Sequence, residues 1–234
     1  MNRYKSIFFD LDKTLYDFER SSDETLRELF AEKALSEMVS YEVFHENYIK
    51  NNLMLWDLYR REGIRKEQLR VQRFSLTFNS LGINIPGLDY FFSEEYLYRS
   101  PRKKALFKGV MPLLDYLFPK YSLLIITNGF EEVQHQKLKS NGIGQFFKAV
   151  ITSEKAGCKK PEPEIFRHAL EAANVDASEA LMVGDDFEVD ILGARNMGMD
   201  QALICHDNTN ARSQATFVVK DLAELHQLFT KFLR

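Results

Sequence analysis

The sequence has little of what builds covalent frameworks, metal frameworks or membrane anchors. Its 234 residues include only two cysteines, Cys158 and Cys205, whose spacing forms no metal-binding pattern and suggests no disulfide framework. This usage fits a reducing compartment, and we expect a cytoplasmic protein. No apolar run approaches the roughly 20 residues that span a bilayer, and the short polar start from Met1 to Lys5 does not resemble a signal peptide. We therefore expect no membrane partner.

A strong charge of either sign is also missing. The formal net charge is −3 at pH 7, so the chain offers no basic footprint for a nucleic acid polymer. A content of 45% hydrophobic and 28% charged residues is that of an ordinary globular protein, and the length suits one large domain or two small ones. We expect a small molecule as the partner. A monomer and a homodimer are both compatible with the sequence.

Short apolar runs recur along the chain, and most of them are separated by amphipathic helical patterns. Runs that are apolar on both faces and spaced by helices favour a parallel sheet covered on both sides. The runs lie at 6–9, 121–127, 147–152, 180–183, 201–205 and 216–219, and the helical patterns at 131–143, 163–175 and 188–199. We expect an α/β fold with a doubly wound, Rossmann-like parallel sheet.

Residues 17–106 follow a different pattern. They contain no comparable apolar run, but they hold several helical patterns rich in aromatic residues. This block separates the first strand from the rest of its sheet. We therefore expect a core formed by 1–16 and 107–234, with an inserted all-helical domain at 17–106.

Polar residues follow three of the apolar runs at the point where each run ends. They are Asp10, Asp12, Thr127, Asn128, Asp185 and Asp186. In doubly wound sheets, ligands bind outside the carboxyl ends of the strands. Three strands thus deliver polar groups to one edge, which predicts a site there.

The acids at this edge need a counter-charge. Two unit charges about 4 Å apart repel by about 4 kcal/mol at an effective dielectric of 20, and Asp10, Asp12 and Asp185 would converge. Mg²⁺ is the natural remedy, because it binds carboxylates together with substrate phosphates. Asp186 and Asp190 lie at i and i+4 of the next helix, where like charges repel. Asp186 is explained as an N-cap, whereas Asp190 is not.

A cation of the protein is also expected near a phosphate. The stretch "GCKKPEPEIF" (157–166) places Lys159 and Lys160 directly before Pro161. The prolines keep this segment out of the preceding helix and hold it extended or turned. A lysine held there could reach the same edge and steady both a nucleophile and a phosphate.

Together these motifs resemble the haloacid dehalogenase-like hydrolase superfamily over nearly the whole chain. "DLDKT" (10–14) resembles its DxDxT signature, and "IITNG" (125–129) its second motif. "KKPEPEIF" (159–166) resembles the third motif, and "GDDFEVDILGA" (184–194) the fourth. The resemblance implies that the helical insertion is the family's cap domain.

The resemblance also implies a mechanism and a role for each residue. Asp10 would attack phosphorus and form an aspartyl-phosphate, and Asp12 would act as general acid and then as general base. The Mg²⁺ ligands would be the side chains of Asp10 and Asp185 and the main-chain carbonyl of Asp12. The substrate's phosphate would be held by Thr127, Asn128 and Lys160, with Asp186 and Asp190 as supporting acids.

Within the superfamily, the second aspartate indicates the reaction class. Dehalogenases lack it, so Asp12 favours a phosphomonoester hydrolase. "DLDKTLYDFERSSDETLRELF" (10–30) is similar to the bacterial pyrimidine 5′-nucleotidase subgroup, although Lys13 stands where many relatives have glycine. Tyr16, Phe18 and Trp56 are candidates for a wall against which a base stacks. The alternatives are a phosphatase of a sugar phosphate or of phosphoglycolate, and a non-catalytic protein that binds phosphorylated metabolites.

Overall fold

The predicted apolar runs form a sheet of six parallel strands, and the polar residues follow three of these strands. The structure, a computed structural model, describes residues 3–205 and 214–231. The strand order is β3-β2-β1-β4-β5-β6, and each neighbouring pair is parallel. The strands are β1 (Ser6–Phe9), β2 (Ser122–Thr127), β3 (Ala149–Thr152), β4 (Ala180–Gly184), β5 (Asp200–Ile204) and β6 (Phe217–Val219). The predicted doubly wound parallel sheet is confirmed, and β1, β2 and β4 lie side by side at its centre.

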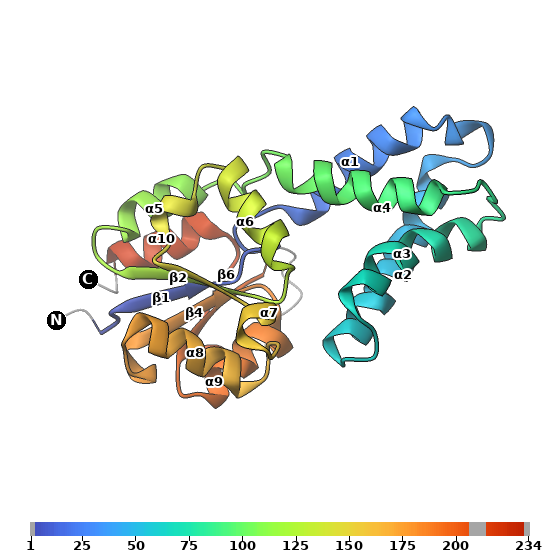
Figure 1. Ribbon diagram of the computed structural model, residues 1–234. Coiled ribbons are helices and arrows are strands. Elements are labelled where there is room, and N and C mark those ends of the chain that lie inside the picture. Colours follow the sequence, from blue (N-terminus) through green and yellow to red (C-terminus); the bar gives the residue numbers. More distant parts are fainter. Residues whose placement is uncertain (1–2, 206–213, 232–234) are drawn as a thin grey trace. The chain divides into compact units, whose positions relative to one another are not determined.

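Helices cover both faces of this sheet (Figure 1). One face packs against α5 (Val110–Leu117), α6 (Glu131–Ser140) and α10 (Leu222–Lys231), and the other against α8 (Pro163–Ala173) and α9 (Gly193–Asn196). The short helix α7 (Ser153–Ala156) follows β3. Because side chains alternate along a strand, Ile7 and Phe9 enter the first core and Phe8 enters the second. All three are completely buried, and each such side chain contributes roughly 1.5–3 kcal/mol of hydrophobic stabilisation.

The chain divides into two compact units, residues 1–18 with 104–234, and residues 19–103. The first unit contains the sheet. Its limits lie two or three residues inside the predicted insertion, because the backbone N–H of Asp17 donates to the carbonyl of Ala105 and that of Phe107 donates to Leu15. These hydrogen bonds tie both chain crossings to the first unit. The interpretation of the second unit as a cap domain stays a prediction.

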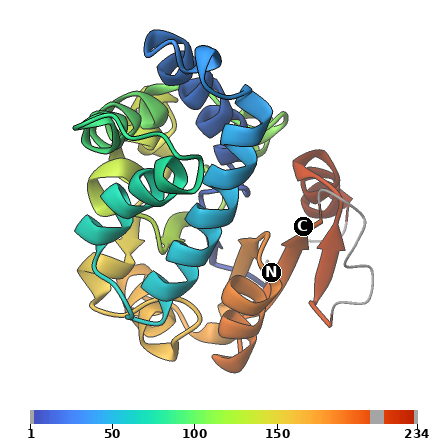
Figure 2. The same cartoon turned by 90° about the vertical axis from the view of Figure 1, so that its right-hand side faces the viewer.

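The second unit is a bundle of helices with an aromatic core. It contains α2 (Tyr41–Arg60), α3 (Lys66–Ser80), α4 (Leu88–Arg99) and most of α1 (Phe18–Glu32). Figure 2 shows α2 as a long light-blue helix, and it packs beside α3. Phe44, Phe78 and Phe92 are buried together, with Phe78 and Phe92 edge to face at a centroid distance of 5.0 Å. Aromatic pairs of this kind favour tilted and edge-on contacts.

One predicted helix differs in detail from the structure. The pattern at 188–199 predicts a single amphipathic helix, but the chain forms a π-helix over Phe187–Leu192 and then the short α9. Short 3₁₀ helices occur at Leu35–Glu37, Ser100–Arg102, Gly144–Phe146 and Ala177–Glu179. Across the described residues, none of the helices has the length and apolar character needed to cross a membrane.

Candidate active site

Asp10 lies at the carboxyl end of β1, where the chain leaves the sheet. Its backbone N–H still donates to the carbonyl of Val183 in β4, at 2.9 Å, so the residue is held by the sheet itself. Its side-chain oxygen Oδ1 accepts a hydrogen bond from the Lys160 ammonium at 2.6 Å. Within the described parts of the chain, its other oxygen, Oδ2, accepts no hydrogen bond. Asp10 is therefore anchored through one oxygen and available through the other.

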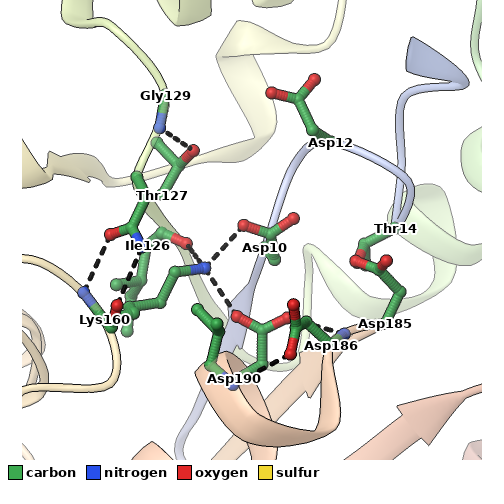
Figure 3. Close-up of polar contacts among 12 residues, drawn as sticks. Asp10, Asp12, Thr14, Ile126, Thr127, Gly129, Lys160, Asp185, Asp186 and Asp190 are labelled. Atoms are coloured by element: carbon green, nitrogen blue, oxygen red, sulfur yellow. Dashed lines mark hydrogen bonds and ion pairs between the residues drawn. The ribbon is translucent and has the colours of Figure 1, made fainter. Parts of the chain in front are cut away.

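Lys160 is a buried cation with three acceptors (Figure 3). Its Nζ lies 2.6 Å from Asp10 Oδ1, 2.7 Å from Asp190 Oδ1 and 2.7 Å from the carbonyl oxygen of Ile126, and the residue is only 2% exposed. An ammonium has three protons, so these contacts use all of them. Burial alone would lower the pKa of Lys160, but the carboxylates of Asp10 and Asp190 raise it above its ordinary value. Lys160 is therefore held as a permanent cation against the predicted nucleophile.

Asn128, just after β2, fixes the backbone of Lys160. Its Nδ2 donates to the Lys160 carbonyl at 2.9 Å, and its Oδ1 accepts from the Lys160 N–H at 2.8 Å. This two-point clamp uses both polar ends of the Asn128 side chain. The geometry gives Asn128 a positioning role, and the predicted contact of Asn128 with substrate stays a prediction. The sequence predicted that Asn128 lies at the carboxyl edge of the sheet, but it could not predict that the backbone of Lys160 is its partner.

The acids after β4 have separate partners. Asp185 Oδ1 accepts from the Thr14 hydroxyl at 3.2 Å, which gives the threonine of the DxDxT motif a role that the sequence did not reveal. Asp186 is exposed and caps the π-helix, because its Oδ1 accepts from the N–H groups of Glu188 and Val189, each at 3.0 Å. Asp190 is buried and is paired with the ammonium of Lys160.

Gly184, the last residue of β4, makes room for this arrangement. A Cβ atom at this position would overlap the carboxylate of Asp190. The backbone of β4 and the Asp190 side chain are therefore packed directly against each other. Asp190 cannot easily move aside, because its Oδ1 accepts from Lys160 and its Oδ2 accepts from the Asp186 N–H at 3.2 Å.

Three carboxylates form a group with the chemistry of a divalent-cation site. Asp10, Asp185 and Asp190 each offer an oxygen, and these oxygens all lie within 4.8 Å of one another. Burial raises the pKa of Asp10 and of Asp190, and burial together with the charge of Asp190 raises the pKa of Asp185 to about 7. Three carboxylates and Lys160 sum to −2, which a divalent cation would balance. The donor set therefore fits Mg²⁺, with Asp10 and Asp185 better placed to bind it because both oxygens of Asp190 already accept hydrogen bonds.

Asp12 is oriented away from these acids (Figure 3). Its Oδ1 lies 2.5 Å from the Nζ of Lys137, and its Oδ2 accepts from Nε2 of Gln134 at 3.0 Å. The sequence prediction that three acidic side chains converge is thus right for Asp10 and Asp185 and wrong for the Asp12 side chain. The carboxylate of Asp12 is paired with the ammonium of Lys137. This finding does not test the prediction that the main-chain carbonyl of Asp12 binds Mg²⁺.

Sequence reasoning missed both partners of Asp12. Gln134 and Lys137 lie on α6, and both are buried on the face that also carries Leu138. Residues three and four apart share a face of a helix, so the sequence placed Gln134 and Lys137 on the same helix face as the apolar Leu138. Two polar residues on an apolar face were the signal from which their role could have been predicted.

Tyr16 is not part of a base-stacking wall. Its side chain is completely buried in the core that covers the α6 face of the sheet. The ammonium of Lys137 lies over the rings of Tyr16 and Phe18, 5.1 Å and 5.4 Å from their centroids. Two aromatic residues that follow the first motif therefore contact the lysine that pairs with Asp12. Trp56 lies in the other unit, and its role stays a prediction.

Comparison with known proteins finds sequences and a structure that match this chain over most of their length. Pyrimidine 5′-nucleotidase YjjG of Escherichia coli is 34% identical over 231 residues, which cover 96% of this chain and 97% of that protein. A glyceraldehyde 3-phosphate phosphatase of Pyrococcus abyssi is 35% identical over 198 residues, which cover 83% of this chain and 79% of that protein. The crystal structure of Bacillus subtilis YfnB bound to magnesium is similar with a TM-score of 0.86 and 25% identity, covering 97% of this chain and 99% of YfnB.

Most of the sequence also matches one protein family. The match runs over residues 4–198 and thus includes β1, the helical unit and the segments that carry Lys160 and Asp185. The parallel sheet, with its acids at the carboxyl ends of β1 and β4, agrees with that match. Because it spans far more than half of the chain, this protein belongs to the haloacid dehalogenase-like hydrolase family.

Proposed function

We propose that the protein is a Mg²⁺-dependent phosphomonoester hydrolase that removes the 5′-phosphate from pyrimidine nucleoside and deoxynucleoside monophosphates. The observation that carries the proposal is the contact between Lys160 and Asp10. A buried, permanently charged ammonium fixes Oδ1 of a carboxylate at the end of β1. The same carboxylate lies within a group of acids suited to a divalent cation.

Asp10 is proposed as the nucleophile. Its Oδ2 attacks the phosphorus atom as the bond between phosphorus and the leaving oxygen breaks, so that the phosphoryl group moves to Asp10. Water then attacks phosphorus and breaks the Asp10–phosphorus bond, which releases inorganic phosphate and restores the carboxylate. Covalent catalysis of this kind divides one difficult displacement into two easier ones. Lys160 supports both steps by keeping Oδ1 fixed and by offsetting charge on the carboxylate.

Asp12 is proposed as the group that moves the proton. It donates a proton to the leaving alkoxide in the first step and takes one from the attacking water in the second. The exchange balances, because each cycle returns Asp12 to its starting form. Positioned acid–base groups contribute typically about 10²- to 10⁴-fold in rate.

The phosphate is proposed to lie between the ends of β1, β2 and β4. The Thr127 hydroxyl would bind one of its oxygens, and Lys160 would attract it through charge, since all three ammonium protons have acceptors in the protein. Asp10, Asp185 and the Asp12 carbonyl would hold a Mg²⁺ ion. Bound there, the ion would offset the charge of the transferring group and orient it. Positioning and charge neutralisation are the main requirements of phosphoryl transfer.

The substrate class rests on similarity to proteins of known activity. YjjG, a pyrimidine 5′-nucleotidase, matches this chain over 96% of its length, and the match includes the helical unit. We propose that this unit is the cap of the family and that its residues select the substrate. The second candidate is glyceraldehyde 3-phosphate, because the Pyrococcus phosphatase is 35% identical over a shorter part of the chain.

Phosphate release from a panel of substrates tests the proposal. The panel holds UMP, dUMP, dTMP, glyceraldehyde 3-phosphate and 4-nitrophenyl phosphate, each with Mg²⁺ and with a chelator. We expect turnover only with Mg²⁺, the highest kcat/KM for a pyrimidine nucleotide, and no turnover by Asp10→Asn. A higher kcat/KM for glyceraldehyde 3-phosphate would favour the second candidate. No release from any phosphate ester would overturn the phosphatase assignment.

A further inference from the structure

Both carboxylate oxygens of Asp12 are held by one helix, α6. Lys137 Nζ lies 2.5 Å from Oδ1, and Gln134 Nε2 donates to Oδ2 at 3.0 Å. Both partners are buried, at 3% and 0% exposure. Two contacts from a rigid helix fix the direction of a side chain far better than one contact from a loop. The orientation of Asp12 is therefore set by residues more than 120 positions away in the sequence.

Gln134 also acts on Thr127, the predicted phosphate ligand. Its Nε2 donates to the Thr127 hydroxyl oxygen at 2.6 Å, and the N–H of Gly129 donates to the same oxygen at 3.0 Å. A hydroxyl has one proton to give and room for two incoming hydrogen bonds. Both acceptor positions are filled, and among the described residues no acceptor takes the proton. Thr127 is thereby held as a donor toward an added anionic oxygen, such as that of a phosphate.

Gly129 gives Gln134 the space to lie there. A Cβ atom at position 129 would overlap the side-chain amide of Gln134. The glycine of the "TNG" stretch therefore allows the glutamine to bridge Thr127 and Asp12 with a single nitrogen. The other polar atom of the amide, Oε1, is buried and has no hydrogen-bond partner among the described residues.

The ion pair of Lys137 is not explained by stability. Removing two charges from water costs several kcal/mol per ion, and apolar residues of similar volume often serve a core equally well or better. The ammonium of Lys137 also lies over the rings of Tyr16 and Phe18. The pair joins a buried lysine to a partly exposed carboxylate, and because that carboxylate belongs to the proposed proton carrier, the pair points to a role in the reaction.

We infer that Gln134 and Lys137 are positioning residues that together orient Asp12 and Thr127 for phosphomonoester hydrolysis. The inference rests on the proposed function of the site. Lys137 acts through Asp12 alone, whereas Gln134 acts through both Asp12 and Thr127. The two residues therefore link the group that moves the proton to the group that holds the phosphate.

Leaving groups distinguish this role from a structural one. A nucleoside leaves as an alkoxide that needs a proton from Asp12, whereas 4-nitrophenolate leaves without one. We expect Lys137→Met to lower kcat/KM for UMP by about 10- to 100-fold, a part of the contribution of general acid catalysis. The same variant should lower kcat/KM for 4-nitrophenyl phosphate by less than about threefold. Gln134→Met should also raise KM for both substrates, because Thr127 loses its orientation.

A double variant gives the second readout. If Lys137 acts through Asp12, Asp12→Asn/Lys137→Met should be no slower with UMP than Asp12→Asn alone, because groups that act as a unit are not additive. Lys139→Met, on the exposed side of α6, is the matched control and should behave like the wild type. If Lys137→Met does not fold, as judged from its melting curve, Lys137→Gln replaces it in the same cycle.

Two outcomes would overturn the inference. One is an equal fall in kcat/KM for both substrates in Lys137→Met. The other is a multiplicative loss in the double variant. A wild-type protein that releases phosphate from neither substrate would instead overturn the proposed function on which the role depends. If the wild type is active and either of these two outcomes is found, the positioning role alone is overturned.

Discussion

Replacing Lys160 by methionine removes the cation from the centre of the site and keeps most of its volume. In the native protein the Nζ atom lies 2.6 Å from Asp10 Oδ1 and 2.7 Å from Asp190 Oδ1. At an effective dielectric of about 20, each contact is a Coulomb attraction of about 6 kcal/mol. The variant leaves three carboxylates within 4.8 Å of one another and no ammonium between them. These groups will respond by taking up protons, so the net loss must be smaller than the sum of the two attractions.

We expect Lys160→Met to lower the free energy of unfolding by about 3–5 kcal/mol at pH 7.5 in the absence of divalent cations, which is typical when one partner of a buried ion pair is removed. The loss should depend on pH. The variant's native state binds more protons than the native wild type, and the unfolded chains have the same carboxyl groups. The difference in free energy of unfolding between the wild type and the variant therefore becomes smaller as the pH falls. One extra proton corresponds to about 1.4 kcal/mol per pH unit, so the loss should shrink to roughly 1–2 kcal/mol at pH 5.5.

Urea unfolding with a chelator, followed by far-UV circular dichroism at both pH values, measures this effect. Lys155→Met, an exposed lysine on α7, is the matched control and should change stability by less than about 0.5 kcal/mol. Asp190→Asn removes a carboxylate that has lost its partner in the Lys160→Met variant. Its effect on the free energy of unfolding should therefore be about 2 kcal/mol more favourable in that variant than in the wild type. A loss below about 1 kcal/mol, or a loss equal at both pH values, would refute the electrostatic reasoning.

The remaining predictions concern metal binding and backbone conformation. Mg²⁺ at a hundred times its dissociation constant should stabilise the wild type by about 2.7 kcal/mol in thermal or urea unfolding, and no shift in the presence of Mg²⁺ would contradict the assignment of the carboxylate group. Gly184→Ala should cost about 1–3 kcal/mol and lower kcat, because the new methyl group overlaps the Asp190 carboxylate; an unchanged melting temperature and kcat would count against this packing. Lys13, at φ 64°, lies in the left-handed region, so Lys13→Gly should stabilise the protein by about 0.5–1 kcal/mol in urea titration, and a destabilised variant would show that other contacts of Lys13 dominate.

The fold and the acids of the site could be predicted because they depend on local patterns. Each apolar run that is buried on both faces became a parallel strand, and a residue that directly follows such a run must lie at the carboxyl edge of the sheet. Asp10, Thr127 and Asp185 were located in this way. The left-handed backbone at Lys13 is a conformation that glycine adopts without strain, which a local pattern of residues does not reveal.

The direction of each side chain could not be predicted, because it is set by partners distant in the sequence. Asp12 follows the same strand as Asp10, yet its carboxylate is bound by Lys137 on α6. Asn128 lies at the edge of the sheet where it was predicted, but its amide is hydrogen-bonded to the backbone of Lys160, 32 residues away. Periodicity gives the face of a helix or strand and not the rotamer of a residue at its end. Such contacts follow only from the packed structure.

Asp10 is proposed to carry the phosphoryl group during turnover. The most direct test is an acid quench of Asp12→Asn during its reaction with 4-nitrophenyl phosphate and Mg²⁺. This substrate needs no proton from Asp12 in the first step, whereas the second step does need Asp12 as the base, so the intermediate should accumulate. Mass spectrometry should find one phosphoryl group on the peptide that contains Asp10, and none in Asp10→Asn/Asp12→Asn. Release of 4-nitrophenol in the first turnover with no phosphoryl group on Asp10, or with the group on another residue, would contradict the claim.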